Sequence, residues 1–416
     1  MTTRPLGARL PIFPTETSVA APARSAAARS ARAPWHQRLR VVASVRWRLR
    51  RSFFAFLNRA FATDDGKQVL AASLNGLLAP PALTLSPGAS SRRQPYPDLP
   101  TVAPARSSSV RGAGPLFITA RFRTGSTLLW NLFRHVEGHT AYYEPFNERR
   151  WFDRSHRGSH TDASHLNVTD YWREYNGLDG LNVLYDEEWV WKHLYMEPAF
   201  WNPAMRRFIE ILVERAPGRA VLQFNHVDFR LPWLRGSFPE ARIVHLYRHP
   251  RDQWVSSLFG SRFPLDGDIA SFEACDRFYL RSWARDLKYR FPFLDERGVS
   301  HPYALFYYIW KLSYLFGVRY SDYSLAFEDL AADPKAELRR LLDAVGGATP
   351  VNVTELASLV APPEIGRWRH YADDAWFRRH EILCEEVLNR FFASTSARAR
   401  AAYRLRPAAK EMVSLP

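Results

Sequence analysis

A cation, a glycine and three hydroxyl residues stand together directly after a short apolar run. Residues 116–120 are apolar or small and predict a buried strand, and an apolar helical pattern begins at residue 128. Between the two lie Arg123, Thr124, Gly125, Ser126 and Thr127. A glycine permits a tight turn, and Ser or Thr is favoured at a helix N-terminus. A strand, a polar turn and a helix N-terminus in this order predict an anion site, usually for phosphate, to which Arg123 adds positive charge.

A second cation stands at the end of another apolar run. Residues 242–247 predict a buried strand, Arg248 follows it, and Pro250 stops it. A helix is expected from about Asp252, and it would carry Ser256, eight residues after the arginine. A planar guanidinium can bind phosphate through two parallel hydrogen bonds, and a hydroxyl can add another. Arg248 and Ser256 are of residue types that suit a phosphate, and the alternative is a surface turn with its charges in solvent.

Together the two stretches resemble the nucleotide-binding motifs of sulfotransferases. The first is not a Walker A loop, because the pattern GxxxxGK[ST] is absent. It is similar to the loop that cradles the 5′-phosphosulfate of 3′-phosphoadenosine 5′-phosphosulfate (PAPS) in that family. The resemblance implies that residues 123–127 bind the phosphosulfate and that Arg248 and Ser256 bind the 3′-phosphate. It further implies transfer of a sulfuryl group from PAPS to a hydroxyl of a carbohydrate, lipid or other small acceptor, by in-line displacement and without a metal.

Two residues at family-like distances are candidates for the base that takes the acceptor proton. Glu144 lies 21 residues after Arg123 in a Glu-Pro pair, as a functional Glu does in tyrosylprotein and many carbohydrate sulfotransferases. His226 lies 22 residues before Arg248, similar to the basic His of cytosolic sulfotransferases, but the Lys of their Lys-Thr-His is missing. We predict Glu144 as the base, because an Arg-type loop goes with the Glu-using branches. His226 is then expected to orient groups or to bond the sulfate.

The alternative for Glu144 is a structural carboxylate that pairs with Arg149 or Arg150. Farther along, residues 364–371 resemble the C-terminal loop that folds over the nucleotide in sulfotransferases. The resemblance implies a set of three further nucleotide-binding residues there: Gly366, Arg367 and Trp368. The arginine would bring charge to phosphate, and the tryptophan would lie near the adenine.

These residues need a scaffold that brings several strand ends together. Apolar patterns predict strands over 116–120, 188–195, 220–228, 242–247 and 323–330, and helices over 198–215, 303–316 and 335–345. The resemblance to sulfotransferases implies one α/β domain over residues 114–400, with a central parallel sheet, helices on both faces and the ligand at the strand C-termini. The resemblance implies the P-loop NTPase-like form of this fold that sulfotransferases have.

The net charge of +15 belongs mainly to the N-terminal region. Residues 1–63 hold twelve arginines and one acidic residue, Glu16, which gives +11. Residues 64–114 hold five basic and three acidic residues, which gives +2 and leaves +2 for residues 115–416. The core therefore offers no electrostatic reason to bind nucleic acid. The expected partner is a small-molecule or glycan acceptor, and nothing in the sequence indicates an oligomeric state.

Three segments are expected ahead of the core. Residues 1–35 are rich in Ala, Arg, Pro and Ser and are expected to be disordered, and residues 63–113 are interpreted as a linker. Residues 36–62 predict a basic amphipathic helix, which can lie on an anionic membrane, dock on the core or act as a targeting segment. No apolar run is long enough to span a membrane. We expect a cytoplasmic protein, with peripheral membrane contact through this helix as an open alternative.

Two other classes of protein stay open. One is a P-loop nucleotide-binding or kinase-like enzyme, which the missing Walker lysine disfavours. The other is a non-catalytic, membrane-associated binding protein on the same fold. A metal site is not expected, since Cys275 and Cys384 form no cluster and the histidines at 156, 160, 165 and 193 have no regular ligand spacing.

Overall fold

The computed structural model describes residues 114–157, 168–260, 262–346, 351–361 and 363–404, and a few positions between 52 and 66. For residues 395–404 it describes the backbone alone. The chain divides into two units, Met1–Ala62 and Thr63–Pro416, and the fold below is that of the second. The disordered tail predicted for 1–35, and most of the helix predicted for 36–62 and the linker predicted for 63–113, lie outside the described residues.

Five parallel strands form a central sheet in the order β2-β3-β1-β4-β5. Their bounds are β1 Leu116–Ala120, β2 His139–Tyr143, β3 Arg219–Phe224, β4 Arg242–Tyr247 and β5 Tyr323–Ala326. The register pairs Thr119 with Phe224 on one side and with His245 on the other, so β1 and its two neighbours end at nearly the same level. The segments that follow these three strands are therefore neighbours in space, as the sequence predicted for a parallel sheet.

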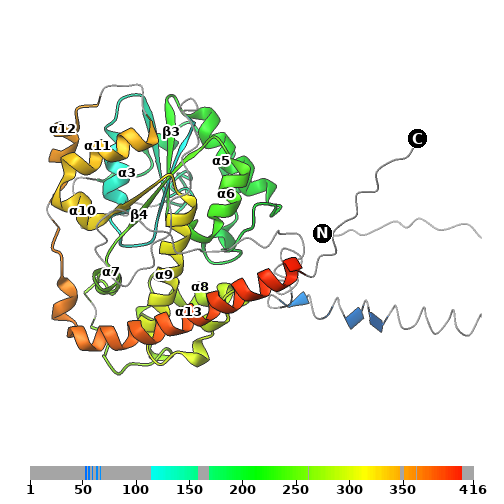
Figure 1. Ribbon diagram of the computed structural model, residues 1–416. Helices are drawn as coiled ribbons and strands as arrows, with labels where there is room; N and C mark the ends of the chain where they lie inside the picture. The colour runs from blue at the N-terminus through cyan, green and yellow to red at the C-terminus, as the bar shows by residue number, and fades with distance from the viewer. Residues whose placement is uncertain are drawn as a thin grey trace, which may run out of the picture. The chain divides into compact units, whose positions relative to one another are not determined.

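Helices cover both faces of this sheet (Figure 1). They are α3 Ser126–Arg134, α4 Leu181–Leu184, α5 Pro203–Arg215, α6 Leu231–Ser237, α7 Pro250–Ser257, α8 Leu280–Leu287, α9 Pro302–Tyr320, α10 Phe327–Ala332, α11 Pro334–Val345, α12 Val353–Ser358 and α13 Asp374–Arg404. Short 3-10 helices are η1 Arg173–Tyr175, η2 Glu187–Val190, η3 Asp228–Arg230, η4 Ser271–Cys275, η5 Pro292–Leu294, η6 Glu296–Gly298 and η7 Arg367–His370. The predicted α/β class is confirmed.

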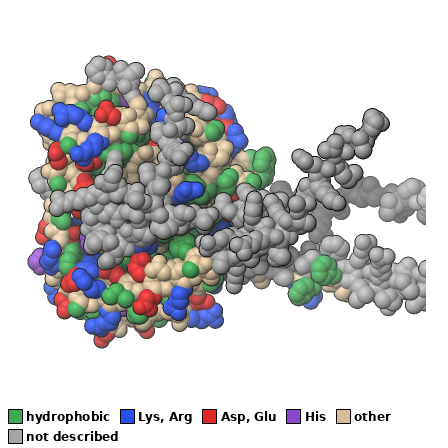
Figure 2. Space-filling view, in the orientation of Figure 1, with side chains coloured by type: hydrophobic (Ala, Val, Ile, Leu, Met, Phe, Trp, Pro, Cys, Tyr) green, Lys and Arg blue, Asp and Glu red, His purple; other side chains and the backbone are tan. Residues whose placement is uncertain are grey.

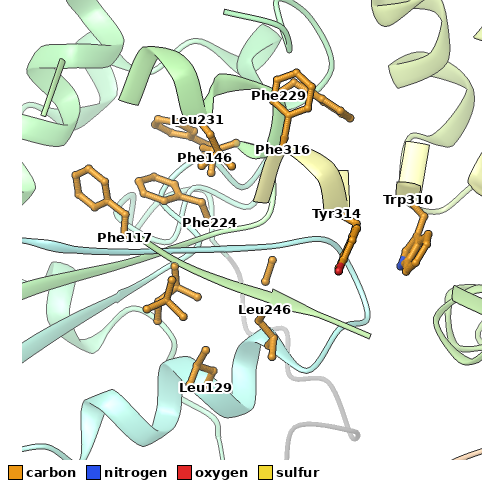
Figure 3. Close-up of a cluster of buried hydrophobic side chains, with 14 of the residues drawn as sticks. Phe117, Leu129, Phe146, Phe224, Phe229, Leu231, Leu246, Trp310, Tyr314 and Phe316 are labelled. Carbon is orange, nitrogen blue, oxygen red and sulfur yellow. The ribbon is translucent and has the colours of Figure 1, made fainter. Parts of the chain in front are cut away.

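Bulky apolar side chains fill both spaces between the sheet and its helices. Phe117 and Phe224 lie on the same side of the sheet as Leu231 of α6 and Phe316 of α9, and Leu129 of α3 lies on the other side (Figure 3). Successive residues of a strand point to opposite faces. Because both faces are covered, the strands are almost continuous apolar runs, which is why the sequence pattern identified them.

The C-terminal helix α13 is fixed to α9 by partly buried carboxylates. Lys311 of α9 pairs with Glu385, and Tyr307 donates to the same carboxylate at 2.8 Å. One turn earlier in α13, Glu381 accepts a hydrogen bond from Tyr303 at 2.6 Å. These contacts lay α13 beside α9, along the lower edge of the view in Figure 1. The predicted helix over 303–316 is confirmed, and it extends from residue 302 to residue 320.

The prediction of a strand over residues 188–195 is wrong. The segment forms η2 and a turn instead. The buried guanidinium of Arg230 donates to three of its backbone carbonyls, including that of His193. Asp286 accepts hydrogen bonds from the backbone N–H groups of His193 and Leu194, each at 2.9 Å. Side chains therefore satisfy the backbone groups that a strand would offer to a neighbouring strand.

The strand predicted over 323–330 is right only in its first half. It ends at Ala326, and the following Phe-Glu-Asp-Leu opens α10. Two acidic residues in the first turn of that helix suit its positive end.

Strand β2 was not predicted. It is an edge strand of the sheet, and its first two residues are only partly buried.

Candidate functional site

The turn after β1 holds the residues predicted to bind the phosphosulfate. Gly125 stands at the N-cap of α3 with φ +93°, and a Cβ there would lie 2.4 Å from the ring of Phe327. Both its left-handed backbone and its lack of a side chain are therefore required. Ser126 and Thr127 begin the helix, and within the described part of the chain no side chain caps it and no acidic residue lies in its first turn. This helix start can accept an anion.

Arg123 connects this turn to the second motif. Its φ of +67° is uncommon for a residue with a side chain, and such conformations concentrate at functional sites. Its Nε donates to Oγ of Ser256 at 3.1 Å, and its guanidinium lies 4.6 Å from the ring centre of Phe259. The structure thus brings the two predicted phosphate-binding motifs into direct contact.

Arg248 completes the contact from the end of β4. Its Nη1 donates to the carbonyl oxygen of Arg123 at 3.3 Å, and its side chain packs over the ring of Phe327. Its buried Nε has no hydrogen-bond partner among the described residues. Burial lowers the pKa of Arg248, and the nearby charges of Arg123 and Arg367 add to this, although two carboxylates oppose it. An anionic ligand would satisfy both the unpaired N–H and the gathered positive charge.

The loop at residues 364–371 lies against the first turn of α7. Asp252 accepts hydrogen bonds from the backbone N–H of Gly366 at 2.8 Å and of Trp368 at 3.2 Å. The indole of Trp368 stacks on His249 with an interplanar angle of 8°. The structure therefore brings Gly366, Arg367 and Trp368 to the same end of the sheet as Arg248.

Glu144 follows β2 directly and is joined to the start of α3. Its carboxylate accepts from Asn147 at 2.5 Å and from Asn225 at 2.7 Å. It also shares a hydrogen bond with Tyr143, whose hydroxyl lies 2.9 Å from Oγ1 of Thr127. Its φ of +42° is a second strained position beside the loop. The network places the carboxyl group of Glu144 two side chains away from the helix start.

The surroundings of Glu144 raise its pKa to about 8. Burial is the largest cause, and the negative charge of Glu148 adds to it, while the bonds from Tyr143 and Asn147 oppose it. Among the described contacts Glu144 forms no ion pair, and Arg150 pairs with Glu187 instead. A carboxyl group with a pKa near neutrality suits proton transfer better than an ordinary structural carboxylate does.

His226 occupies a different environment. It is fully buried, its ring lies edge-on 4.9 Å from Phe122, and Trp283 and Tyr279 lie close by. Neither ring nitrogen has a hydrogen-bond partner in the described structure. Burial holds its pKa well below the ordinary value, and Arg230 and Arg121 lower it further. His226 is therefore neutral and a weak base, and no hydrogen bond links it to the other candidates.

Sequence reasoning missed four residues that position the site. Asn147 and Asn225 hold Glu144, Asp252 holds the C-terminal loop, and Phe327 packs under both Gly125 and Arg248. Three of these four act on residues 79 or more positions away in the chain, so no local pattern identifies them. Asn147 alone is close in sequence to its partner.

Fold and site define an α/β protein with a candidate site for an anionic ligand at the carboxyl ends of its parallel strands. A family model described as the sulfotransferase family matches residues 115–305, which contain the loop, Arg248, Ser256, Glu144 and His226. This part of the chain therefore matches the sulfotransferase family, whose general activity is transfer of a sulfuryl group. The loop at 364–371 lies beyond the matched residues.

The chain is also similar to a solved structure, that of a sulfotransferase from Alicyclobacillus acidocaldarius. The identity is 15%, the match covers 70% of this chain and 96% of that chain, and the TM-score is 0.29. A likeness at this score supports no conclusion about the site. No curated protein matches the chain.

The remaining surface and side chains give few further signals. Positive and negative side chains are interspersed on the described surface in Figure 2. Within the described ranges, no group of three His, Cys, Asp or Glu residues could hold a metal ion, and Cys275 and Cys384 are both free thiols. None of the helices that the structure describes is long and apolar enough to cross a membrane.

Proposed function

We propose that this protein transfers a sulfuryl group from PAPS to a hydroxyl group of a carbohydrate, a lipid or another small acceptor. The observation that carries the proposal is the junction of Arg123, Ser256 and Arg248, in which the buried Nε of Arg248 has no hydrogen-bond partner among the described residues. Two phosphate-binding motifs that touch each other suit a nucleotide with phosphate groups at both its 5′ and 3′ positions. The family of residues 115–305 supports the same reaction class.

Each group has a task in such a transfer. Sulfuryl transfer resembles phosphoryl transfer in its in-line geometry and in its dependence on positioning and charge. Arg123 and the N-terminal end of α3 can stabilise the negative charge that develops on the leaving oxygen. Arg248 and Ser256 can hold the 3′-phosphate, and the loop with Trp368 can cover the nucleotide.

The acceptor hydroxyl must lose its proton, and Glu144 is the group best suited to receive it. Its two asparagine partners fix the orientation of the carboxyl group but use only part of its acceptor capacity. Its pKa of about 8 makes it a stronger base than an ordinary glutamate once it is ionised. The ring nitrogens of the buried, neutral His226 have no hydrogen-bond partner among the described residues, and its pKa is unfavourable for this role.

Calorimetric titration of the full chain distinguishes the functional classes. Tight binding of 3′-phosphoadenosine 5′-phosphate, much weaker binding of ATP–Mg²⁺, and loss of binding in Arg123→Ala are the expected results. Preference for ATP–Mg²⁺ would instead favour a kinase-like enzyme. Incubation with labelled PAPS and a host extract then tests turnover, with Glu144→Gln as the control. Nucleotide binding without a labelled product would point to the non-catalytic class.

A further inference from the structure

Asp252 holds a distant segment of the chain through its backbone. It lies in the first turn of α7 and is 2% exposed. Its two carboxylate oxygens accept the N–H groups of Gly366 and Trp368, which lie 114 and 116 residues later in the chain. These two N–H groups flank Arg367, so one buried carboxylate fixes the backbone on both sides of that arginine.

The residue before it, Arg251, holds the segment that follows the loop. Its guanidinium forms two hydrogen bonds with Glu381, at 2.8 and 2.6 Å, and a third with Asp374 at 2.7 Å. It also lies 4.8 Å from the ring centre of Trp368 and 5.2 Å from that of Phe377. The first turn of α7 therefore fixes both the loop and the start of α13. The loop between these attachments is placed by side chains rather than by a neighbouring strand.

The anchored loop brings Arg367 to the end of the sheet at which Arg248 lies. Its charge is close enough to Arg248 to lower the pKa of that residue. Its own described ion pair, with Glu364 at 3.5 Å, joins two half-exposed or exposed side chains. Such a pair is worth little in water. The guanidinium of Arg367 can therefore exchange this pair for a bound anion at small cost.

We propose that Asp252 is a positioning residue, which holds the loop so that Arg367 reaches the same anion as Arg248. The inference rests on the proposed function, because that anion is the 3′-phosphate of the nucleotide. A loop fixed in advance loses less conformational freedom when the ligand binds. An asparagine at 252 has one acceptor oxygen and would turn its NH₂ group towards a backbone N–H, so it cannot hold both amides.

The direction in which anion affinity changes distinguishes a positioning role of Asp252 from a purely electrostatic one. Asp252 is a negative charge near Arg248, so its neutralisation alone would tighten anion binding. Loss of the anchored loop would weaken anion binding instead. Asp252→Asn removes the charge and the anchor together, and Asp252→Glu keeps the charge but displaces the acceptor oxygens. Positioning predicts weaker binding in both variants.

The test is titration of the full chain with 3′-phosphoadenosine 5′-phosphate and with adenosine 5′-phosphate. We expect Asp252→Asn to weaken binding of the 3′-phosphorylated nucleotide about tenfold and to affect the other nucleotide much less. In an Arg367→Ala background, Asp252→Asn should weaken binding of the 3′-phosphorylated nucleotide by less than about twofold, because the arginine through which Asp252 acts is gone. Unchanged or tighter binding, or a full loss that persists in the Arg367→Ala background, overturns the inference.

Asp286→Asn is the matched control. Asp286 is a partly buried carboxylate that likewise accepts two backbone N–H groups, from His193 and Leu194 at 2.9 Å each, but outside the site. It should leave the preference for the 3′-phosphate unchanged.

Amide hydrogen exchange of the unliganded chain tests the anchor itself. Exchange at Gly366 and Trp368 should become faster in Asp252→Asn and stay unchanged in Asp286→Asn. Unaltered exchange in Asp252→Asn would contradict the anchoring role even if no nucleotide binds. Absence of nucleotide binding by the unmodified chain would instead refute the proposed function, so the two failures are distinguishable.

Discussion

Arg123 and Ser256 lie 133 residues apart in the chain and share a hydrogen bond of 3.1 Å. One belongs to the turn after β1 and the other to α7, so the bond joins the segments that follow two neighbouring strands of the sheet. Arg248 reinforces the junction by donating to the carbonyl oxygen of Arg123. The two predicted phosphate positions are therefore adjacent.

Replacement of Arg248 tests the assignment of the 3′-phosphate. Arg248→Ala should weaken binding of 3′-phosphoadenosine 5′-phosphate about ten- to a hundredfold, because a charge-assisted contact is worth roughly 1.5–3 kcal/mol. Binding of adenosine 5′-phosphosulfate, which lacks the 3′-phosphate, should change far less. Titration calorimetry measures both affinities. Arg206→Ala, at an exposed position of α5, is the control for loss of one positive charge. Equal losses for the two nucleotides would remove the assignment.

Gly125→Ala should destabilise the fold. A positive φ costs a residue with a side chain roughly 1–2 kcal/mol, and the new Cβ would also meet the Phe327 ring at 2.4 Å. Urea unfolding measures the loss of free energy of unfolding. Gly298→Ala is the control, because a Cβ there has nothing described within 4 Å and its φ is not positive. In a Phe327→Leu background, Gly125→Ala should cost less, because the steric part of the penalty falls. A cost equal to that of Gly298→Ala would contradict the prediction.

The sequence predicted the parts of the site that depend on local patterns. β1 and β4 are apolar runs followed by a turn, so the local pattern alone places Arg123 and Arg248 at strand ends. It could not predict the contact between Arg123 and Ser256, since this depends on strand order in the sheet. It also failed at residues 188–195, where side chains from elsewhere replace a strand neighbour. A single sequence has no local pattern that identifies side-chain partners far apart in the chain.

Removal of residues 1–62 should leave nucleotide binding intact. The contacts that define the site lie within residues 121–368, and most of the basic excess of the chain lies before residue 64. Calorimetry on the truncated and full chains should give equal affinities for 3′-phosphoadenosine 5′-phosphate. Flotation with anionic liposomes should show binding of the full chain only, if the basic helix predicted for 36–62 contacts membranes. A folded truncation that loses nucleotide binding would show that the N-terminal region completes the site.

The pKa of Glu144 predicts how activity depends on pH. Because a base must be ionised and the pKa of Glu144 is about 8, kcat/KM should rise with pH up to about 8 and then level off. In Glu144→Gln the remaining activity should lose this rise.

The pKa of Glu144 in the folded protein is also above its ordinary value of 4.5, so the folded state binds the proton more tightly than the unfolded state does. Stability from this group should therefore be fully present below about pH 4.5 and be lost as pH rises towards 8.

Substitution of the two candidate bases decides between them. Glu144→Gln keeps the size of the side chain and removes the proton acceptor, so kcat should fall by about 10²–10⁴ while nucleotide affinity changes little. His226→Asn should cost less, because His226 is buried among aromatic rings, has neither nitrogen hydrogen-bonded within the described structure, and has a pKa far below neutrality. Loss of the His226 side chain is expected to reduce stability through packing rather than to block proton transfer, which thermal unfolding would show.

Asn225→Ala adds a finer test, since it removes the hydrogen bond of 2.7 Å that orients the Glu144 carboxyl group. It should lower kcat less than Glu144→Gln does, and the two substitutions together should cost little more than Glu144→Gln alone. If Glu144→Gln retains near-normal turnover and His226→Asn abolishes it, His226 is the base and Glu144 is a structural carboxyl group.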